Sequence, residues 1–369
     1  MSTRVRSYAK VNLGLAIGPV REDGFHGLVT LYQTLDLHDF VTVSVVRGGE
    51  TRLSLTSNDR RVPCDARNTA WRMVEWALER MGVRAEVTIH IEKRLPIQGG
   101  MGAGSANAAA ALIALEKELG ETLSEEERLQ LAGEVGSDVP LFLVGGAVLG
   151  TGRGEIVQGV EDFAATACVV AIPSVGVSTP AAFREWDARY AASVAAGGDW
   201  QAGVGGWGGI VDPQLTSPPF RDTLNELSRV YATCFAEKQK LSGGAGSSGI
   251  VRNPSLGLSL GKRQVGMADG LAENTLLALV RTGIENDFEE VVFSQYPSLR
   301  EIKRQLMGMD SEAPAWYAAL SGSGSALFGL YESDAAARAA QQRLQASGVT
   351  ALITETLPRA EYWGRMVAE

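Results

Sequence analysis

A glycine-rich segment between a strand-like run and a helix-like run constrains the fold of this chain more than any other feature. Residues 93–115 read KRLPIQGGMGAGSANAAAALIAL, and four of the six positions 99–104 are glycine. The run 87–91 (VTIHI) is rich in β-branched residues, and 107–115 is rich in alanine, the residue of highest helix propensity. Glycine permits positive φ angles and close approach of a ligand, while free N–H groups at a helix N-terminus attract an anion. The segment therefore predicts either a phosphate-binding loop or an ordinary tight turn before a helix.

The residues around the glycines distinguish between the known kinds of phosphate loop. A Walker A loop needs a lysine after its last glycine, but Gly104 is followed by Ser105 and Ala106. A dinucleotide-binding fingerprint would place its third glycine at Ser105. The HRD and DFG triplets of protein kinases do not occur in the sequence. What remains is a proline, three residues and Gly-Met-Gly-Ala-Gly-Ser before a helix of small residues.

This remaining pattern, Pro96 to Ala106, resembles the second sequence motif of the GHMP kinases, the family of galactokinase, homoserine kinase and mevalonate kinase. Seven further segments of the sequence resemble motifs of one group within the family. This group comprises the kinases of 4-diphosphocytidyl-2-C-methyl-D-erythritol in non-mevalonate (MEP) isoprenoid precursor biosynthesis. Several motifs in the expected order are far more specific than one glycine-rich loop. The matching segments are SYAKVNLGLAIG (7–18), REDGFH (21–26), LDLHD (35–39), GSDVPLF (136–142), GTGRGE (150–155), NDFE (286–289) and LSGSGSALF (320–328).

The resemblance implies an α+β, two-domain GHMP kinase fold with ATP in the cleft between the domains. The N-terminal domain with the glycine-rich loop is expected at 1–165, and the C-terminal domain at 166–369. A Gly/Trp-rich stretch at about 187–261 has no counterpart in the usual family members, so we interpret it as an insertion, with a helix at 220–238. Elsewhere the residue patterns predict strands at 4–15, 28–37, 39–46 and 349–356, and helices at 67–82, 124–134 and 334–347.

Two charged residues are candidates for catalysis. Lys10 lies in an apolar strand, with Asn12 on the same face two residues later, and Asp138 directly precedes an apolar run. By themselves these residues also fit a solvated strand face and a turn or helix cap. The resemblance implies that Asp138 is the general base and that Lys10 stabilises the transferring phosphoryl group and keeps Asp138 ionised.

The resemblance also implies a set of binding residues. Phe25 would stack on the cytosine of the substrate, His26 would bond to the edge of the base, and Asn12 would also contact the substrate. A third glycine element, with Gly322, Ser323 and Gly324, is expected beside the phosphates. The implied ATP-binding residues are Pro96, Ile97, Gln98, Gly99, Gly100, Met101, Gly102, Ala103, Gly104, Ser105, Ala106 and Asn68.

The glycine-rich loop departs from the usual family pattern at two positions. Ala103 stands where family members usually have glycine, and Ala106 where they usually have serine. Ser105 is therefore the expected hydroxyl of this loop, and it is placed either to cap the helix or to contact a phosphate or Mg²⁺. The cofactors implied are ATP and Mg²⁺.

Composition narrows the range of partners. A formal net charge of −9 argues against a nucleic-acid or anionic membrane surface as the main partner. The N-terminus lacks an apolar signal region, and no run of about 20 apolar residues occurs. The three cysteines and three histidines have no metal-ligand spacing. These observations predict a cytoplasmic protein, monomer or homodimer, that binds no nucleic acid or membrane and whose substrate is a cytidine diphosphate-linked methylerythritol.

The expected reaction is transfer of a phosphoryl group from ATP to the 2-hydroxyl of 4-diphosphocytidyl-2-C-methyl-D-erythritol. Two alternatives stay open. One is a GHMP kinase that acts on another small alcohol, such as homoserine, mevalonate or a sugar. The other is a non-catalytic nucleotide-binding regulator on the same fold, with the Gly/Trp-rich insertion as its partner surface.

Overall fold

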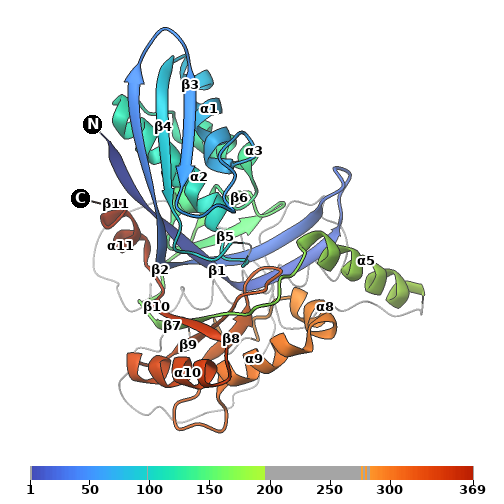
Figure 1. The fold of residues 1–369 in the computed structure, drawn as a ribbon. Helices are drawn as coiled ribbons and strands as arrows, with labels where there is room; N and C mark the ends of the chain where they lie inside the picture. The colour runs from blue at the N-terminus through green and yellow to red at the C-terminus, as the bar shows by residue number, and fades with distance from the viewer. Residues whose placement is uncertain (1, 98, 196–275, 277–278, 281–282, 369) are drawn as a thin grey trace, which may run out of the picture.

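The computed structural model describes residues 2–368 apart from 98, 196–275, 277–278 and 281–282. These residues form two β-sheets, each with helices packed against it (Figure 1). Gln98, most of the expected insertion at 187–261 and the expected helix at 220–238 lie outside the described residues.

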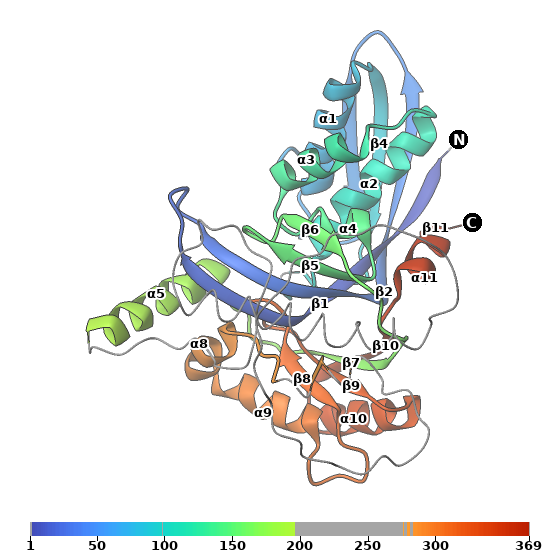
Figure 2. The ribbon, with the colours of Figure 1, turned by 180° about the vertical axis from the view of Figure 1, so that it is seen from behind.

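The first sheet contains seven strands in the described part of the chain, in the order β11-β1-β2-β4-β3, with β5 paired to β2 and β6 to β5. Helices α1 to α4 accompany it, and α1, α2 and α3 lie together on one of its faces (Figure 2). The strands are β1 (Thr3–Val20), β2 (His26–Arg47), β3 (Arg52–Ser57), β4 (Ala85–Glu92), β5 (Ala147–Thr151), β6 (Ile156–Gly159) and β11 (Val367–Ala368). The helices are α1 (Thr69–Met81), α2 (Ala103–Leu119), α3 (Glu125–Val135) and α4 (Leu141–Val144).

The second sheet has the order β10-β7-β9-β8 and is antiparallel throughout. Helices α9 and α10 pack on one of its faces, while α5 extends away from the body of the molecule (Figure 1). Its strands are β7 (Ala167–Ile172), β8 (Tyr317–Leu320), β9 (Leu327–Tyr331) and β10 (Thr350–Glu355). The helices of this half are α5 (Thr179–Ala195), α8 (Phe288–Gln295), α9 (Pro297–Met307) and α10 (Asp334–Ala346).

Strand β1 serves both halves of the molecule because its side chains alternate between two faces. Ala9, Val11 and Leu13 belong to an apolar cluster that also contains Val170 and Phe328 of the second sheet. The intervening positions of the strand point to the opposite face. The same backbone segment therefore joins the two sheets and presents a second set of side chains to the candidate site.

The C-terminal segment returns to the first sheet. Helix α11 (Arg359–Gly364) packs there through Tyr362, whose hydroxyl donates to the Phe142 carbonyl at 2.6 Å. Val367 then pairs with Val5, so β11 lies beside β1. The expected domain boundary at 165/166 stays a prediction. Strand β11 follows the second sheet in the sequence but pairs with β1 in the first sheet.

Local signals in the sequence explain where several helices begin and end. The Asn68 Oδ1 accepts from the Ala70 N–H at 2.9 Å and caps α1, which ends at the left-handed residue Gly82. The expected capping box of Ser124 and Glu127 is confirmed at the start of α3. Strand β2 is continuous where two strands were expected at 28–37 and 39–46.

We expect Ser333→Ala to lower the free energy of unfolding by about 1 kcal/mol, since Ser333 caps α10 by accepting from the Ala336 N–H. The measurement is a urea unfolding curve. Ser333→Thr, which keeps a capping hydroxyl, is the matched control and should stay close to the wild type. Equal losses for both variants would contradict the cap as the cause.

Candidate active site

The glycine-rich loop connects the end of β4 to the start of α2. Its helix begins at Ala103, earlier than the expected start at Asn107. The N-cap is Gly102, a left-handed residue with φ of 70°, so the capping role considered for Ser105 is wrong. Ser105 instead lies in the first turn of α2. Ala103 has right-handed helical backbone there, which is why a side chain is tolerated at this position.

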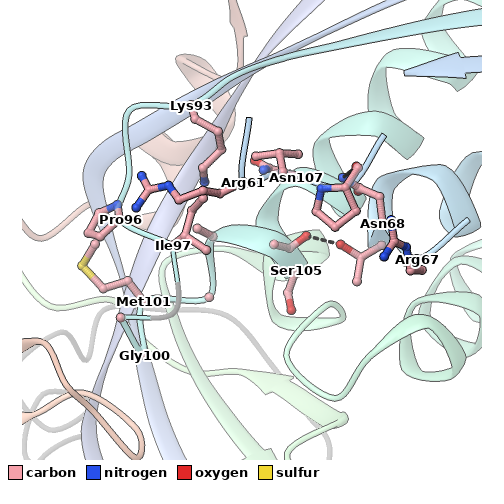
Figure 3. Close-up of a pocket in the computed structure, with 17 residues that line it drawn as sticks. Arg61, Arg67, Asn68, Lys93, Pro96, Ile97, Gly100, Met101, Ser105 and Asn107 are labelled. Atoms are coloured by element: carbon pink, nitrogen blue, oxygen red, sulfur yellow. Dashed lines mark hydrogen bonds between the residues drawn. The ribbon is translucent and has the colours of Figure 1, made fainter. Parts of the chain in front are cut away.

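A cavity of about 370 Å³ opens between the glycine-rich loop and the segment 61–69 (Figure 3). Sequence reasoning anticipated the loop and Asn68 but missed three cationic side chains in the lining, Arg61, Arg67 and Lys93. Each of these cations is paired with a carboxylate, that of Asp59, Asp65 and Asp39 respectively, so the backbone N–H groups at the N-terminus of α2 are the groups that suit an anionic ligand. The expected ATP-binding residues that line the cavity are Pro96, Ile97, Gly99, Gly100, Met101, Gly102, Ala103, Gly104, Ser105 and Asn68.

Two of the residues expected to bind the nucleotide, Ala106 and Asn68, make contacts within the protein that support the fold. Ala106 is buried in the core of the first half and does not line the cavity. The Asn68 amide caps α1 and also donates to the Pro63 carbonyl at 2.8 Å, so it holds the wall of the cavity in place. Sequence alone could not separate this role from a direct ligand contact.

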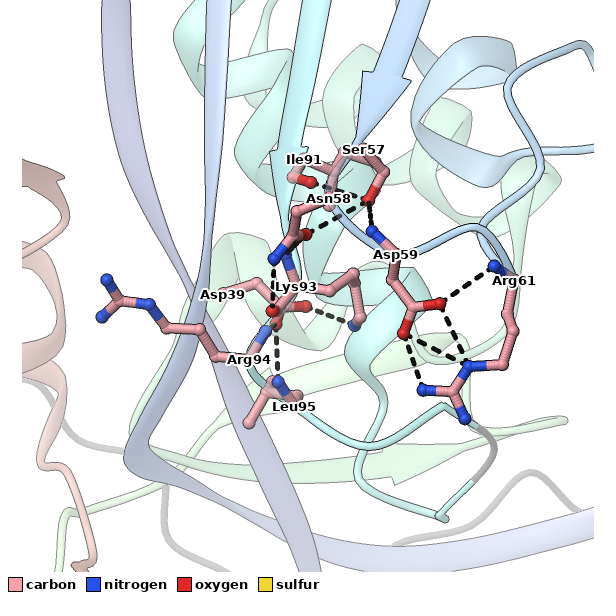
Figure 4. Close-up of polar contacts among 9 residues, drawn as sticks. All are labelled: Asp39, Ser57, Asn58, Asp59, Arg61, Ile91, Lys93, Arg94 and Leu95. Atoms are coloured by element: carbon pink, nitrogen blue, oxygen red, sulfur yellow. Dashed lines mark hydrogen bonds and ion pairs between the residues drawn. The ribbon is translucent and has the colours of Figure 1, made fainter.

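A buried carboxylate fixes the start of the glycine-rich loop (Figure 4). Asp39 is fully buried, forms an ion pair with Lys93, and accepts from the N–H groups of Arg94 and Leu95 at 2.6 and 2.8 Å. Asn58, at the end of β3, bonds to both the N–H and the carbonyl of Lys93. The signal in the sequence was an aspartate at the end of the run LDLHD, directly before the apolar residues Phe40 and Val41.

Lys10 and Asp138 come together although they lie far apart in the sequence. The Lys10 Nζ is 3.4 Å from the Asp138 Oδ2, and the lysine side chain is almost fully buried. The Lys10 N–H donates to the Met101 carbonyl at 3.1 Å, which places this pair against the glycine-rich loop. Tyr32, which sequence reasoning missed, donates from its hydroxyl to the Asp138 Oδ1 at 3.0 Å.

Asn12 holds Lys10 in position. Its Oδ1 accepts from the Lys10 Nζ at 2.7 Å, and its Nδ2 donates to the Thr30 hydroxyl at 2.8 Å. The side chain is buried. This geometry favours a positioning role over the substrate contact expected for Asn12.

The third glycine element packs directly against the glycine-rich loop. The Ser321 hydroxyl donates to the Gly100 carbonyl at 2.9 Å, and the Ala326 N–H donates to the Gly99 carbonyl at 3.2 Å. Asn286 supports the third glycine element by donating to the Leu320 and Gly322 carbonyls, each at 2.8 Å. Of the three expected residues, Gly322 lies beside Lys10, while the Ser323 hydroxyl bonds to Thr179 rather than to the loop. Gly324 keeps a positive φ of 90°.

Phe25 and His26 lie at the turn between β1 and β2. Phe25 is exposed, with the Arg153 guanidinium 4.9 Å from its ring centroid. The His26 ring stacks on Phe183 with centroids 4.8 Å apart, and its two nitrogens lie close to the Gly18 carbonyl and the Asp187 carboxylate. The expected base-binding pair therefore belongs to a larger aromatic and charged group.

The described residues show neither a metal-binding cluster nor a membrane-spanning helix. Within the described ranges, no cluster of three or more His, Cys, Asp or Glu side chains is arranged to hold a metal ion. Among the helices that the structure describes, none combines the length and the apolar character needed to cross a lipid bilayer.

Comparison with known families agrees with this architecture. The model of the GHMP kinases N terminal domain matches residues 68–146, and that of the GHMP kinases C terminal matches 267–350. The two-sheet fold and the glycine-rich cavity thus define a GHMP kinase fold, and each half of the chain contains a segment that matches a GHMP kinase family model. The expected α+β, two-domain fold class is confirmed.

Individual relatives narrow the resemblance further. The chain is 42% identical to a 4-diphosphocytidyl-2-C-methyl-D-erythritol kinase of Nocardioides sp., over 50% of this chain and 63% of the relative. It is 44% identical to the kinase of the same name from Streptomyces coelicolor, over 51% and 62%. The chain thus spans less than two thirds of the length of these curated relatives.

Solved structures give the same result over nearly the whole chain. A crystal structure of 4-(cytidine 5'-diphospho)-2C-methyl-D-erythritol kinase superposes with a TM-score of 0.60 at 26% identity, covering 96% of this chain and 99% of that one. A homoserine kinase from Cytophaga hutchinsonii also has a TM-score of 0.60, at 18% identity, with coverages of 97% and 95%. The second likeness supports the fold alone.

We expect Gly100→Ala to destabilise the protein more than Gly120→Ala. Both glycines have positive φ, at 76° and 68°, so each substitution carries a similar backbone strain of about 1–2 kcal/mol. A Cβ at Gly100 would also lie 2.1 Å from the Ser321 carbonyl oxygen, whereas a Cβ at Gly120 would have no neighbour within 4 Å. The overlap should add about 1–3 kcal/mol in denaturant unfolding. Equal losses would show that the two glycine elements separate freely.

Proposed function

We propose that this chain is a cytoplasmic, ATP-dependent kinase that phosphorylates the 2-hydroxyl of 4-diphosphocytidyl-2-C-methyl-D-erythritol. The observation that carries the proposal is the contact of Lys10 with Asp138 beside the glycine-rich loop. A cation and a carboxylate next to an anion site are the groups that phosphoryl transfer to an alcohol requires. The names of the curated relatives support the choice of substrate.

The cavity fits the phosphates of a nucleotide. The N–H groups of the loop and of the first turn of α2 would hold the phosphates, while Lys93, Arg61 and Arg67, each already paired with a carboxylate, line the cavity. A Cβ at Gly102 would lie 2.9 Å from the Phe142 ring and 3.1 Å from the Lys10 Cγ, so the absence of a side chain lets the loop pack closely against both residues. When bound, Mg²⁺ would neutralise charge on the phosphates.

The protein offers few ligands for Mg²⁺. Ser105 is the candidate hydroxyl of the loop, and the described residues hold no carboxylate cluster. Mg²⁺ commonly keeps several waters and binds through substrate phosphates with one or two protein groups, which agrees with so sparse a set. Ser105 therefore remains our proposed metal or phosphate contact.

Asp138 and Lys10 would perform the chemistry that the protein itself supplies. Asp138 accepts the proton of the substrate hydroxyl as that oxygen forms its bond to the γ-phosphorus and the bond from this phosphorus to the leaving oxygen breaks. Lys10, held by Asn12, stabilises negative charge on the transferring group. Phe25 would hold the cytosine by stacking, and His26 would bond to the edge of the base in exchange for its contact with Asp187.

The first test is turnover by the purified protein with ATP and Mg²⁺, with homoserine, mevalonate and galactose as competing acceptors. We expect turnover with 4-diphosphocytidyl-2-C-methyl-D-erythritol alone. Asp138→Asn should lower kcat by roughly 10²- to 10⁴-fold because the general base is lost. Turnover with another alcohol would keep the Lys10–Asp138 chemistry and reject the substrate, and near wild-type turnover of Asp138→Asn would reject the base.

The Phe25 ring tests the substrate end separately. Phe25→Ala should raise KM for the cytidyl substrate with little effect on KM for ATP, since the exposed ring lies away from the residues that line the nucleotide cavity. Losing one base stack of about 1–3 kcal/mol corresponds to roughly a five- to 150-fold increase. Phe25→Tyr, which keeps an aromatic face, is the control. Equal increases in KM for both substrates would point to misfolding instead.

A further inference from the structure

Tyr32 is a buried residue next to the proposed base that has no role in the reaction as described above. Its hydroxyl donates to the Asp138 Oδ1 at 3.0 Å, while the other carboxylate oxygen, Oδ2, lies 3.4 Å from the Lys10 Nζ. The two oxygens of Asp138 thus have different partners, one neutral and one cationic. Asp138 itself is about one-third exposed, so the carboxylate also faces solvent.

The position of the Tyr32 ring is fixed from several directions. Strand β2 pairs with β1 at Asn12 and with β5 at Val148, one on each side of Tyr32. The Lys10 Nζ also lies 5.4 Å from the centroid of the ring. The backbone of Tyr32 is paired on both sides, and its ring lies near a cation, so the side chain has little freedom to move.

Two glycines of the GTGRGE segment leave the space that the ring occupies. A Cβ at Gly150 would lie 2.5 Å from the Tyr32 Cε2, and a Cβ at Gly154 would lie 2.5 Å from the Tyr32 hydroxyl oxygen. Gly154 also has a positive φ of 100°. This segment, which sequence reasoning noted without assigning a role, therefore forms a slot that directs the hydroxyl to Asp138.

We propose that Tyr32 is a positioning residue whose hydroxyl fixes the rotation of the Asp138 carboxylate, so that this group meets the substrate hydroxyl in one orientation. The inference rests on the proposed function. The terminal torsion of an aspartate is broad and roughly two-fold, and a single contact with Lys10 leaves it free to turn. A second contact from a rigid strand removes that freedom and lowers the cost of reaching a reactive geometry.

The electrostatic surroundings keep Tyr32 a hydrogen-bond donor. Burial raises the pKa of Tyr32 well above its ordinary value, and the neighbouring carboxylates of Asp138 and Glu155 raise it further. The hydroxyl therefore stays protonated at neutral pH. Lys10 supplies the positive charge at the site, and Tyr32 supplies direction without altering the net charge.

The test is Tyr32→Phe, which removes the hydroxyl and keeps the ring. We expect kcat with the cytidyl substrate to fall roughly ten- to hundredfold, the value of a hydrogen bond to a charged group. KM for ATP and for the cytidyl substrate should not change, because Tyr32 is buried and is not among the residues that line the nucleotide cavity. Tyr331→Phe is the matched control, since it also removes a buried hydroxyl, one that donates to the Leu306 carbonyl in the second half, and should keep wild-type kcat.

A double-mutant cycle separates positioning from packing. If Tyr32 acts through Asp138, Tyr32→Phe should cost little further activity in the Asp138→Asn background, because residues that act as a unit are non-additive. Wild-type kcat in Tyr32→Phe, the same fold loss in both backgrounds, or a rise in both KM values would overturn the inference and leave the proposed function standing. A wild-type protein without turnover would overturn both.

Discussion

The buried ion pair of Asp39 and Lys93 determines where the glycine-rich loop starts, and the geometry of the site depends on it. A carboxylate without solvent contact is tolerated only when its charge and lone pairs are satisfied, and here a lysine and two backbone N–H groups satisfy them. Because Asp39 belongs to β2 and its partners leave β4, the bonds join neighbouring strands at the point where the chain enters the loop. The glycines that follow can then be accessible to a ligand while the start of their loop is held in one position.

The alternation of side chains along β1 then decides which residues pack in the core and which face the site. Successive β1 residues point to opposite faces, so Val11 fills the apolar layer between the two sheets while Lys10 and Asn12 face the site. The third glycine element reaches the loop through Ser321 and is braced by Asn286. The same short stretch of β1 thus holds the two sheets together and places the charged groups of the site.

Sequence patterns predicted those parts of the structure that short-range physics governs. The cap of α3, the left-handed end of α1 and the fold class are examples, since each depends on local residue preference or on an ordered set of motifs. The start of α2 was misjudged because a left-handed glycine, not a serine, caps it. Tyr32, Lys93 and the pairing of β11 with β1 could not be derived, because each depends on contacts between segments distant in the chain.

The pairing of Val367 with Val5 also has a consequence for biosynthesis. Domains generally fold as units in the order in which the ribosome makes them. Here the edge of β1 at Arg4 and Val5 stays open until residues 367–368 have been made, after all the described strands of the second sheet. An open strand edge is a template for pairing with other chains, so this part of β1 is exposed to misassembly during translation until β11 has been made.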